Sequence, residues 1–239
     1  MKETILGVDV TDKNYKEISE SIIYDINAGK QSFIVAVNPE KVLKAQKDEK
    51  LRQLLNQATY QIPDGIGIIL ASKIKKGNIR ERVTGIDLLF KISQMAEQHQ
   101  KSIFLYGAKP EVNELAKQNL LKYYPNLNIV GTMHGYEKDE QLIIDKINES
   151  KADILFVGLG SPRQENWIIE NMKKLDVSIF QGVGGSYDVL SGKINRAPAI
   201  FRKFGLEWLY RLLVEPNRIK RQIKLPIFLI KVLMSKNES

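Results

Sequence analysis

The sequence predicts an α/β fold with a mostly parallel sheet, followed by a C-terminal helical appendage. Short β-branched runs alternate with longer segments of helical periodicity through the first 195 residues. The runs are apolar at almost every position, as in strands that helices cover on both faces. After residue 195 the composition changes to aromatic and basic residues interrupted by prolines. Together these observations favour a layered, Rossmann-like architecture with an added C-terminal segment.

The alternating segments give the expected elements in chain order. The expected strands cover residues 33–37, 102–106, 128–131, 153–157 and 177–180. The expected helices cover residues 15–27, 39–57, 86–98, 111–123, 140–150 and 164–173. Because strands alternate with helices, each connection is long enough to bring the next strand back parallel to the last.

Several expected strands end in glycine or a small polar residue. Asn38 follows the first strand and Gly107 the second, while glycine pairs occur at residues 158–160 and 182–185. In open α/β sheets, ligands bind beyond the carboxyl ends of the strands. We therefore expect these positions to line one cleft.

Net charge divides the chain at the same place as composition. The whole chain carries +8, and residues 196–239 contain ten basic and three acidic residues, which gives +7 there. The sequence thus predicts a catalytic domain over residues 1–195 and a basic appendage over residues 196–239 that needs an anionic partner. Its aromatic and apolar side chains, among them Trp208, Tyr210 and the run 227–230, suit an anionic membrane surface.

No apolar run approaches the ~18 residues that span a bilayer, and no secretory leader is evident. We expect a cytoplasmic protein that lies peripherally on the inner face of the plasma membrane.

Several classes of site are excluded by composition and motif. The chain has no cysteine and only two histidines, so thiolate and multi-histidine metal sites are absent. Residues 158–163 begin like a dinucleotide-binding turn but place Arg163 at the third glycine position. Neither a phosphate-binding P-loop nor the serine-hydrolase elbow occurs, and no Asp-x-Asp pair is present to hold a metal. No cofactor and no metal are expected.

The remaining candidate residues each allow two interpretations. Asp64, between Pro63 and Gly65, either caps a following helix or serves as a fixed general base. Arg82 is either a surface charge or a ligand for phosphate. Gln164 either sits in the first turn of a helix or hydrogen-bonds a ligand, and Tyr136 either stacks on a nucleobase or covers the sheet end.

The chain carries, in order, the motifs Asn38-Pro39-Glu40, Pro63-Asp64-Gly65-Ile66-Gly67, Arg82-Val83-Thr84-Gly85, Gly107-Ala108, His134-Gly135-Tyr136, Gly158-Leu159-Gly160-Ser161-Pro162-Arg163-Gln164-Glu165, Gly182-Val183-Gly184-Gly185-Ser186-Tyr187-Asp188-Val189 and Arg196-Ala197-Pro198. Read together, these motifs closely resemble the WecB/TagA/CpsF family of bacterial glycosyltransferases. The resemblance covers essentially the whole chain, including the segment from Gly205 to Arg218.

The resemblance implies transfer of N-acetylmannosamine from a UDP donor to a GlcNAc that a diphosphate links to a polyprenyl lipid. It further implies inversion at the anomeric carbon without a metal, in the synthesis of teichoic acid or a related surface polysaccharide. One alternative is the same reaction with another UDP-hexose or with the uronic acid of the same donor. Two others are a non-catalytic nucleotide-sugar sensor and a nucleic-acid-binding module, although we expect no nucleic acid partner. Assembly into a homo-oligomer stays open.

The resemblance also assigns roles to residues. Asp64 matches the aspartate taken as the base, and Asn38, Arg82 and Gln164 match positions near the donor sugar and diphosphate. Further positions expected at the substrates are Tyr136, Asp188, Gly107, Gly160, Gly184, Gly185, Arg211, Arg218 and Arg221. One departure is visible, because family members often carry a threonine shortly before the asparagine, whereas Ala36 and Val37 precede Asn38 here.

Overall fold

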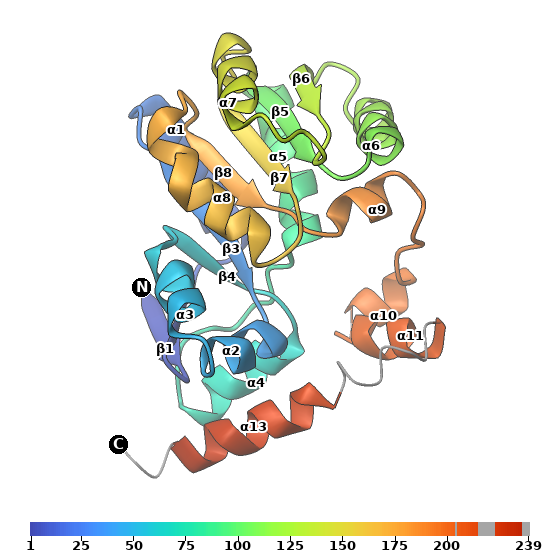
Figure 1. The fold of residues 1–239 in the computed structure, drawn as a ribbon. Coiled ribbons are helices and arrows are strands. Elements are labelled where there is room, and N and C mark those ends of the chain that lie inside the picture. Colours follow the sequence, from blue (N-terminus) through green and yellow to red (C-terminus); the bar gives the residue numbers. More distant parts are fainter. Residues whose placement is uncertain (204, 215–222, 236–239) are drawn as a thin grey trace.

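A computed structural model describes residues 1–203, 205–214 and 223–235; of residues 202, 203 and 211 it describes only the backbone. Its centre is a six-stranded sheet in the order β4-β3-β8-β7-β5-β6, in which every neighbouring pair is parallel (Figure 1). The predicted α/β fold with a parallel sheet is confirmed.

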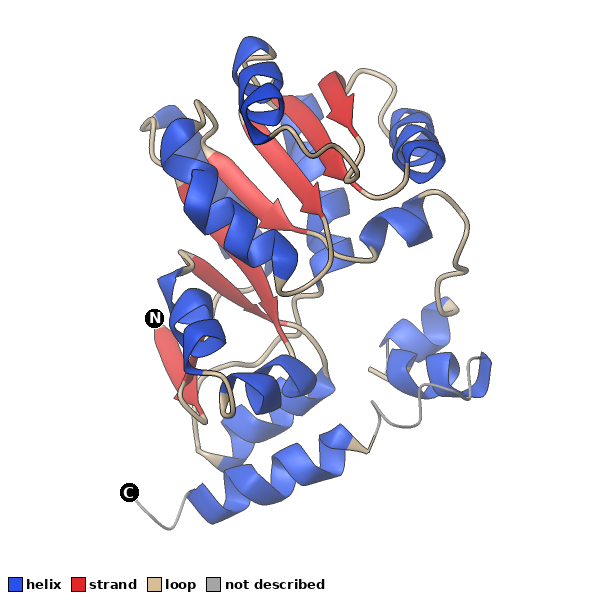
Figure 2. Cartoon of the chain, viewed as in Figure 1, coloured by secondary structure: helices blue, strands red, loops and turns tan. Residues whose placement is uncertain are grey.

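The elements alternate along the chain as Figure 2 shows. The strands are β1 (Lys2–Ile5), β2 (Val8–Thr11), β3 (Ser32–Val37), β4 (Tyr60–Pro63), β5 (Ser102–Gly107), β6 (Asn128–Met133), β7 (Ile154–Gly158) and β8 (Ile179–Gly182). The helices are α1 (Tyr15–Asn27), α2 (Pro39–Ala45), α3 (Glu49–Gln57), α4 (Ile66–Ile74), α5 (Gly85–Gln98), α6 (Pro110–Tyr123), α7 (Glu140–Glu149), α8 (Arg163–Asn171), the 3₁₀ turn η1 (Met172–Lys174), α9 (Ser186–Leu190), α10 (Ala199–Lys203), α11 (Glu207–Val214) and α13 (Lys224–Ser235).

The sheet is buried on both faces. Along β3, Phe33, Val35 and Val37 belong to one hydrophobic cluster, while Ile34 between them belongs to the other. Side chains alternate across a strand, so apolar residues at every position mean that helices cover both sides. The two clusters are the core of the molecule, and they leave the strand ends as the place for polar chemistry.

Four local features differ from the expected elements. An antiparallel hairpin, β1 and β2, precedes the first expected strand, and the short strand β4 was not among the expected strands. The expected helix 39–57 is two helices, because Asp48 accepts the Leu51 amide and starts α3 as its N-cap. The last strand starts at Ile179 rather than at residue 177, since the Gln31 amide binds the carbonyl oxygen of Val177 at 3.2 Å.

The C-terminal helices lie beside the helices that follow β3 and β4. Helix α13 packs against α2 and α4. Its Phe228 and Val232 are fully buried in the main cluster, which is the hydrophobic cluster that also contains Phe33, Val35 and Val37. Lys224 at its start donates to Glu40 at 2.8 Å. The expected lipid contact by Phe228 is therefore wrong, because that ring completes the core. The division into domains at residue 195 stays a prediction.

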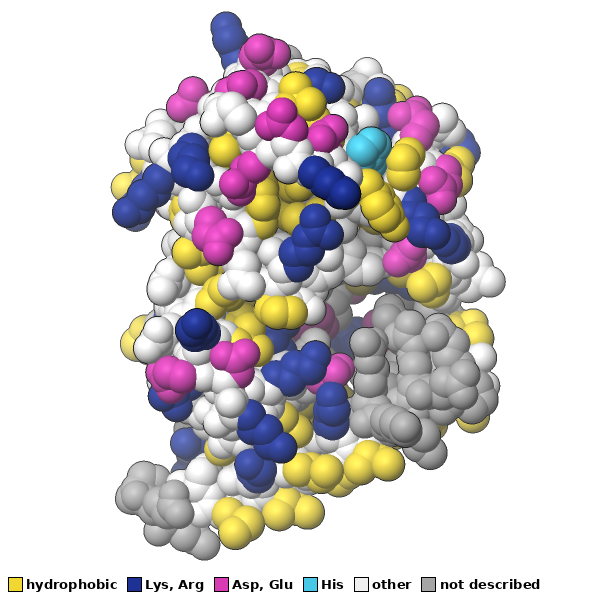
Figure 3. All heavy atoms as spheres, in the orientation of Figure 1, with side chains coloured by type: hydrophobic (Ala, Val, Ile, Leu, Met, Phe, Trp, Pro, Cys, Tyr) yellow, Lys and Arg dark blue, Asp and Glu magenta, His cyan; other side chains and the backbone are white. Residues whose placement is uncertain are grey.

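The opposite face of α13 carries an apolar stripe. Its exposed side chains include Ile227, Ile230, Leu233 and Met234, and hydrophobic atoms gather along the α13 edge of the surface in Figure 3. Among the residues described, no helix combines the length and the hydropathy that crossing a membrane requires.

Close packing at Gly67 joins α2, α4 and α13. A Cβ atom at Gly67 would lie 2.4 Å from Pro39 Cγ and 2.6 Å from Leu225 Cδ1. We predict that Gly67→Val lowers the free energy of unfolding by about 1–3 kcal/mol, as overpacking does. Urea titration followed by circular dichroism measures the change.

Gly85→Ala is the matched control for this substitution. Its Cβ would lie 3.6 Å from Ala36 Cβ, an ordinary contact, and alanine favours a helix. Equal stability of the two variants would contradict the three-helix packing at Gly67.

Candidate active site

Asn38 and Asp64 lie side by side at the carboxyl ends of β3 and β4. Val37 pairs with Pro63 across the two strands, and the Asp64 amide donates to the Val37 carbonyl oxygen at 2.8 Å. Asn38 is the N-cap of α2, where its Oδ1 accepts the Lys41 amide at 2.9 Å. With Oδ1 engaged in this cap, Nδ2 is the Asn38 group that can donate to a ligand.

The helix-cap interpretation of Asp64 is wrong in position. The N-cap residue of α4 is Gly65, whose backbone adopts φ 102° and ψ 150°. Such a φ lies in a region that glycine adopts without strain, so Gly65 makes the sharp turn into α4. Asp64 stands one residue earlier, at the strand end, where a general base would meet a substrate.

Arg82 belongs to the same corner of the sheet. The Val83 amide donates to the Pro63 carbonyl oxygen at 3.0 Å, which holds the segment around Arg82 against the end of β4. The Arg82 guanidinium lies 3.9 Å from Glu207 Oε2, and both side chains are largely buried. Arg82 thus links the sheet edge to α11 of the appendage.

Tyr15 and Thr84 contact each other next to the segment that carries Arg82. The Tyr15 hydroxyl accepts the Thr84 amide at 2.8 Å, and Thr84 caps α5 through its hydroxyl. Burial raises the pKa of Tyr15 to about 12; hydrogen bonds with Thr84 oppose the rise, and the negative charges of Asp87 and Asp64 add to it. Tyr15 therefore stays a neutral hydroxyl near Asp64 at any physiological pH.

Gln164 lies under the turn that follows β8. Its Oε1 accepts the Gly184 amide at 2.9 Å, and its Nε2 donates to Glu165 Oε1 at 3.1 Å. Only 3% of Gln164 is exposed. A Cβ at Gly182 would lie 2.7 Å from Gln164 Nε2, so the glycine makes room for the amide.

A buried ion pair crosses from α2 to α8. Lys41 Nζ lies 2.9 Å from Glu165 Oε1, with the lysine side chain 11% exposed and the glutamate fully buried. Since β3, β8 and β7 are neighbours in the sheet, this pair lies at the middle of the carboxyl edge. It connects the Asn38 corner to the Gln164 turn.

The ends of β5, β6 and β7 are joined by backbone contacts. The Ala108 amide donates to the Gly158 carbonyl oxygen at 2.9 Å, and the Gly135 amide donates to the Ala108 carbonyl oxygen at 2.8 Å. A Cβ at Gly107 would lie 2.5 Å from the Gly158 backbone, and its φ is 120°. Only glycine fits at Gly107 under both conditions.

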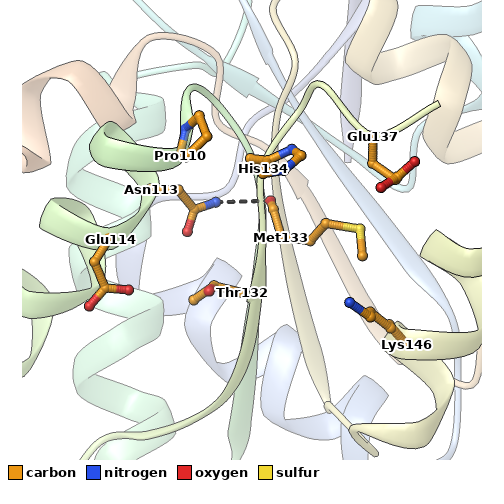
Figure 4. A pocket seen from close by; sticks show the side chains of 8 residues that line it. All are labelled: Pro110, Asn113, Glu114, Thr132, Met133, His134, Glu137 and Lys146. Carbon is orange, nitrogen blue, oxygen red and sulfur yellow. Dashed lines mark hydrogen bonds between the residues drawn. The ribbon is translucent and has the colours of Figure 1, made fainter. Parts of the chain in front are cut away.

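Tyr136 follows β6 and is 62% exposed. Beside it, a pocket of about 210 Å³ opens between α6, β6 and α7 (Figure 4). Figure 4 shows Asn113 donating to the Met133 carbonyl oxygen, while Glu137 and Lys146 lie on the other side of the pocket. The sequence-predicted aromatic residue thus lies at a strand end with its ring accessible to a ligand.

The remaining candidate positions divide into two groups. Gly160 adopts φ 80° before α8, Gly185 starts α9, and Asp188 lies in the first turn of α9. The Arg211 side chain, Arg218 and Arg221 fall outside the described residues.

The described strand ends therefore bring the predicted residues to one edge, in two connected sets. Asn38, Asp64 and Arg82 form the first set, and Gln164 with Gly184 the second. Sequence reasoning missed Lys41 and Glu165, which join the sets from positions 124 residues apart. Among the residues that the structure describes, no cluster of three or more His, Asp or Glu side chains is arranged to hold a metal ion.

Comparisons with known proteins identify the family of the chain. The model of the family described as glycosyl transferase WecG/TagA/CpsF matches residues 3–239. The chain is 36% identical over 240 residues to the N-acetylglucosaminyldiphosphoundecaprenol N-acetyl-beta-D-mannosaminyltransferase of Staphylococcus aureus strain MRSA252. The protein of the same name from strain NCTC 8325 has the same identity. Each alignment covers 99% of this chain and 94% of the relative. Since the family model spans nearly the whole chain and the relatives are 36% identical over 99% of it, the chain belongs to the WecG/TagA/CpsF family and is a glycosyltransferase.

Proposed function

We propose that this enzyme transfers N-acetylmannosamine from UDP to the GlcNAc of a polyprenyl-diphosphate-linked acceptor, with inversion and without a metal. The observation that carries the proposal is the meeting of Asn38, Asp64 and Arg82 at adjoining strand ends. The Staphylococcus aureus relatives, named for this transfer, match nearly the whole chain. The product would be a precursor of teichoic acid or of a related surface polysaccharide.

Asp64 serves as the general base. Inversion requires a group that takes the proton of the acceptor hydroxyl while this oxygen attacks the anomeric carbon from the face opposite UDP. The bond from the anomeric carbon to the UDP oxygen breaks as the new glycosidic bond forms. The hydrogen bond from the Asp64 amide to the Val37 carbonyl oxygen fixes the Asp64 backbone at the end of β4, the position from which its carboxylate would act.

Arg82 and backbone amides balance the charge of the departing UDP. A guanidinium presents a fork of donors that suits a diphosphate, and the turns at Gly160 and Gly184 add N–H groups. Asn38 adds its Nδ2 donor near the donor sugar. The threonine that relatives often carry before the asparagine is absent here, so a contact of its hydroxyl is lost or replaced.

The nucleoside would lie toward β5, β6 and β7. Tyr136 is exposed there for stacking, Gly107 allows close backbone approach, and Asp188 supplies an acceptor from α9. Arg211, Arg218 and Arg221 are proposed to reach the substrates from the appendage. Glu207 of α11 already lies beside Arg82, so the appendage is close enough to complete the site.

A direct assay tests the proposed function. Purified full-length enzyme is incubated with a panel of UDP-sugars and a short-chain GlcNAc-diphosphate lipid, and product is identified by mass spectrometry. Transfer from UDP-N-acetylmannosamine supports the proposal, whereas preference for another UDP-hexose or for the uronic acid reassigns the donor. UDP-sugar binding without product would indicate a sensor.

Asp64→Asn is expected to retain the fold and UDP binding but to lower turnover by ~10²–10⁴-fold, because the amide keeps the shape and loses the proton acceptor. Steady-state rates with the lipid acceptor and titration calorimetry with UDP measure the two effects. Asp48→Asn is the control, since asparagine also caps a helix and α3 lies away from the strand ends. Near-native turnover of the Asp64 variant would place the base elsewhere.

Arg82→Ala is expected to lower turnover by ~10²-fold, the scale of losing one preorganised charge contact in the transition state. Arg80→Ala is the control, because that side chain is exposed and donates only to the Gly77 carbonyl oxygen in the described structure. Rates are measured at saturating donor, so that a loss of binding alone does not lower them.

The same assay in EDTA tests the metal-independent part of the proposal. Activity should survive chelation, because arginine and backbone amides carry the leaving-group charge. Activity lost in EDTA and restored by Mg²⁺ or Mn²⁺ would refute this account.

The appendage is further proposed to hold the enzyme on an anionic membrane surface. The exposed stripe of α13 supplies apolar side chains, while basic residues of the appendage attract anionic headgroups at about 1 kcal/mol each. Lys224 is paired with Glu40, so the positive charge that attracts anionic headgroups must come from other basic residues of the appendage. A lipid-linked acceptor would then be presented at the surface on which the enzyme rests.

Replacing Ile227, Ile230 and Met234 together by serine is expected to lower binding to vesicles of phosphatidylglycerol and phosphatidylcholine by ~10-fold or more, because buried CH₂ groups each contribute about 0.8 kcal/mol. Sedimentation with vesicles measures it. Leu115→Ser on α6 is the control, since Leu115 and Ile227 are both 44% exposed. Unchanged sedimentation of the triple variant would refute membrane contact by α13.

A further inference from the structure

A buried polar network runs beneath the carboxyl ends of β3, β7 and β8. We propose that Lys41 and Glu165 are positioning residues that fix the orientation of the Gln164 amide, and that Gln164 in turn holds the Gly184 turn in the shape that binds the donor. The proposal rests on the proposed function for the identity of the donor. The contacts that define the network are all within the protein and are present without a ligand.

Each link in the network is short. Lys41 Nζ donates to Glu165 Oε1 at 2.9 Å, Gln164 Nε2 donates to the same oxygen at 3.1 Å, and the Gly184 amide donates to Gln164 Oε1 at 2.9 Å. Gln164 is 3% exposed and Glu165 is fully buried. In this network the two polar ends of the Gln164 amide are engaged by Glu165 and by the Gly184 amide, so Gln164 acts by holding the turn.

The direction of the amide follows from the chemistry of its two neighbours. An ionised carboxylate can only accept hydrogen bonds, and a backbone N–H can only donate. The carboxylate of Glu165 therefore requires Gln164 to present Nε2 to it, which leaves Oε1 for Gly184. If the amide were reversed, Gln164 Oε1 would face the Glu165 carboxylate, which is a second acceptor. Gln164 Nε2 would face the Gly184 N–H, which is a second donor.

Lys41 holds the Glu165 carboxylate in place. Among the described residues, the second oxygen, Oε2, is buried without a hydrogen-bond partner, so Lys41 is the cation that compensates the carboxylate. Removing one partner of a buried pair leaves a charge without compensation. Because the Lys41 amide is held by Asn38 Oδ1, the network also couples the turn to the Asn38 corner.

The turn at Gly184 needs the hydrogen bond to Gln164, because glycines give its backbone many alternative conformations. Gly184 adopts φ 51°, and Gly182 lacks the Cβ that would collide with Gln164. Two glycines so close together leave the segment with many accessible conformations. One hydrogen bond from the Gly184 amide to a fixed acceptor selects the native conformation.

Single substitutions test the links. Glu165→Gln and Lys41→Met should each speed amide hydrogen exchange at Gly184 and raise the donor KM by ~10-fold, the effect of losing a hydrogen bond of ordinary strength. Exchange is measured by mass spectrometry on peptides covering residues 180–190, without substrate. Lys44→Met on the same helix is the control, because it breaks only the exposed pair with Glu40 at 3.6 Å.

A swap variant separates orientation from general destabilisation. Gln164→Glu alone places two carboxylates against each other and should speed exchange at Gly184. The double variant Gln164→Glu/Glu165→Gln restores the pattern once the Lys41 ammonium turns from the position of Oε1 to that of Oε2. The carboxylate at position 164 then accepts the Gly184 amide, while the amide at position 165 donates to it through Nε2 and accepts from Lys41 through its oxygen. Slow exchange and the wild-type donor KM should return to within about twofold, a difference small beside the factor of ten that 1.4 kcal/mol produces.

Three outcomes overturn the proposal: exchange at Gly184 unchanged in Glu165→Gln, donor KM unchanged while exchange accelerates, or a swap variant that folds and still exchanges as fast as Gln164→Glu. Thermal melts identify variants that fail to fold. If a single variant fails to fold, exchange at Gly184 in the swap variant decides whether amide orientation matters. Calorimetric titration of the wild-type enzyme with UDP keeps the two hypotheses apart. Absence of UDP binding would refute the proposed function, whereas the exchange data would still test the network.

Discussion

Burial of the sheet on both faces is the constraint on which the rest of the structure depends. Helices cover both sides, so a polar side chain within a strand must find its partner inside the protein. The Nε2 groups of Gln61 and Gln181 do so by donating to backbone carbonyl oxygens, whereas no described group donates to the buried Oε1 atom of either side chain. The carboxyl edge, where the strands stop and the chain turns into the next helix, is the place that this burial leaves for polar chemistry. Asn38 and Asp64 lie along this edge.

The appendage depends on the same edge. Helices α2 and α4 start at the ends of β3 and β4, and α13 packs across both. The close approach at Gly67 makes this contact tight, while Glu40 and Arg82 give it polar contacts with Lys224 and Glu207. One group of helices thus carries the residues after Asn38 and Asp64 and supports the C-terminal segment.

Much of this architecture could be predicted from the sequence. Continuous β-branched runs have a periodicity that indicates buried strands, and the main helices follow from their apolar spacing. Strand β4 was not predicted, because four residues give too short a pattern of apolar positions. The break between α2 and α3 at Asp48 was not predicted either, because the helical spacing of apolar residues continues across it. The sequence offered Asp64 as a helix cap or a general base, and only backbone geometry shows that Gly65 occupies the cap position while Asp64 follows β4. Glu165 belongs to a motif seen in the sequence, but its pairing with Lys41 depends on how three strands are ordered, so no local pattern predicts it.

The burial of Phe228 and Val232 has a consequence for folding. These residues complete the core from a helix that lies far along the chain from α2 and α4, so the surface of α2 and α4 that they cover stays open until this long-range contact forms. An apolar surface left open in this way promotes aggregation until α13 docks. Docking of α13, rather than completion of the sheet, is then the event that closes the native structure.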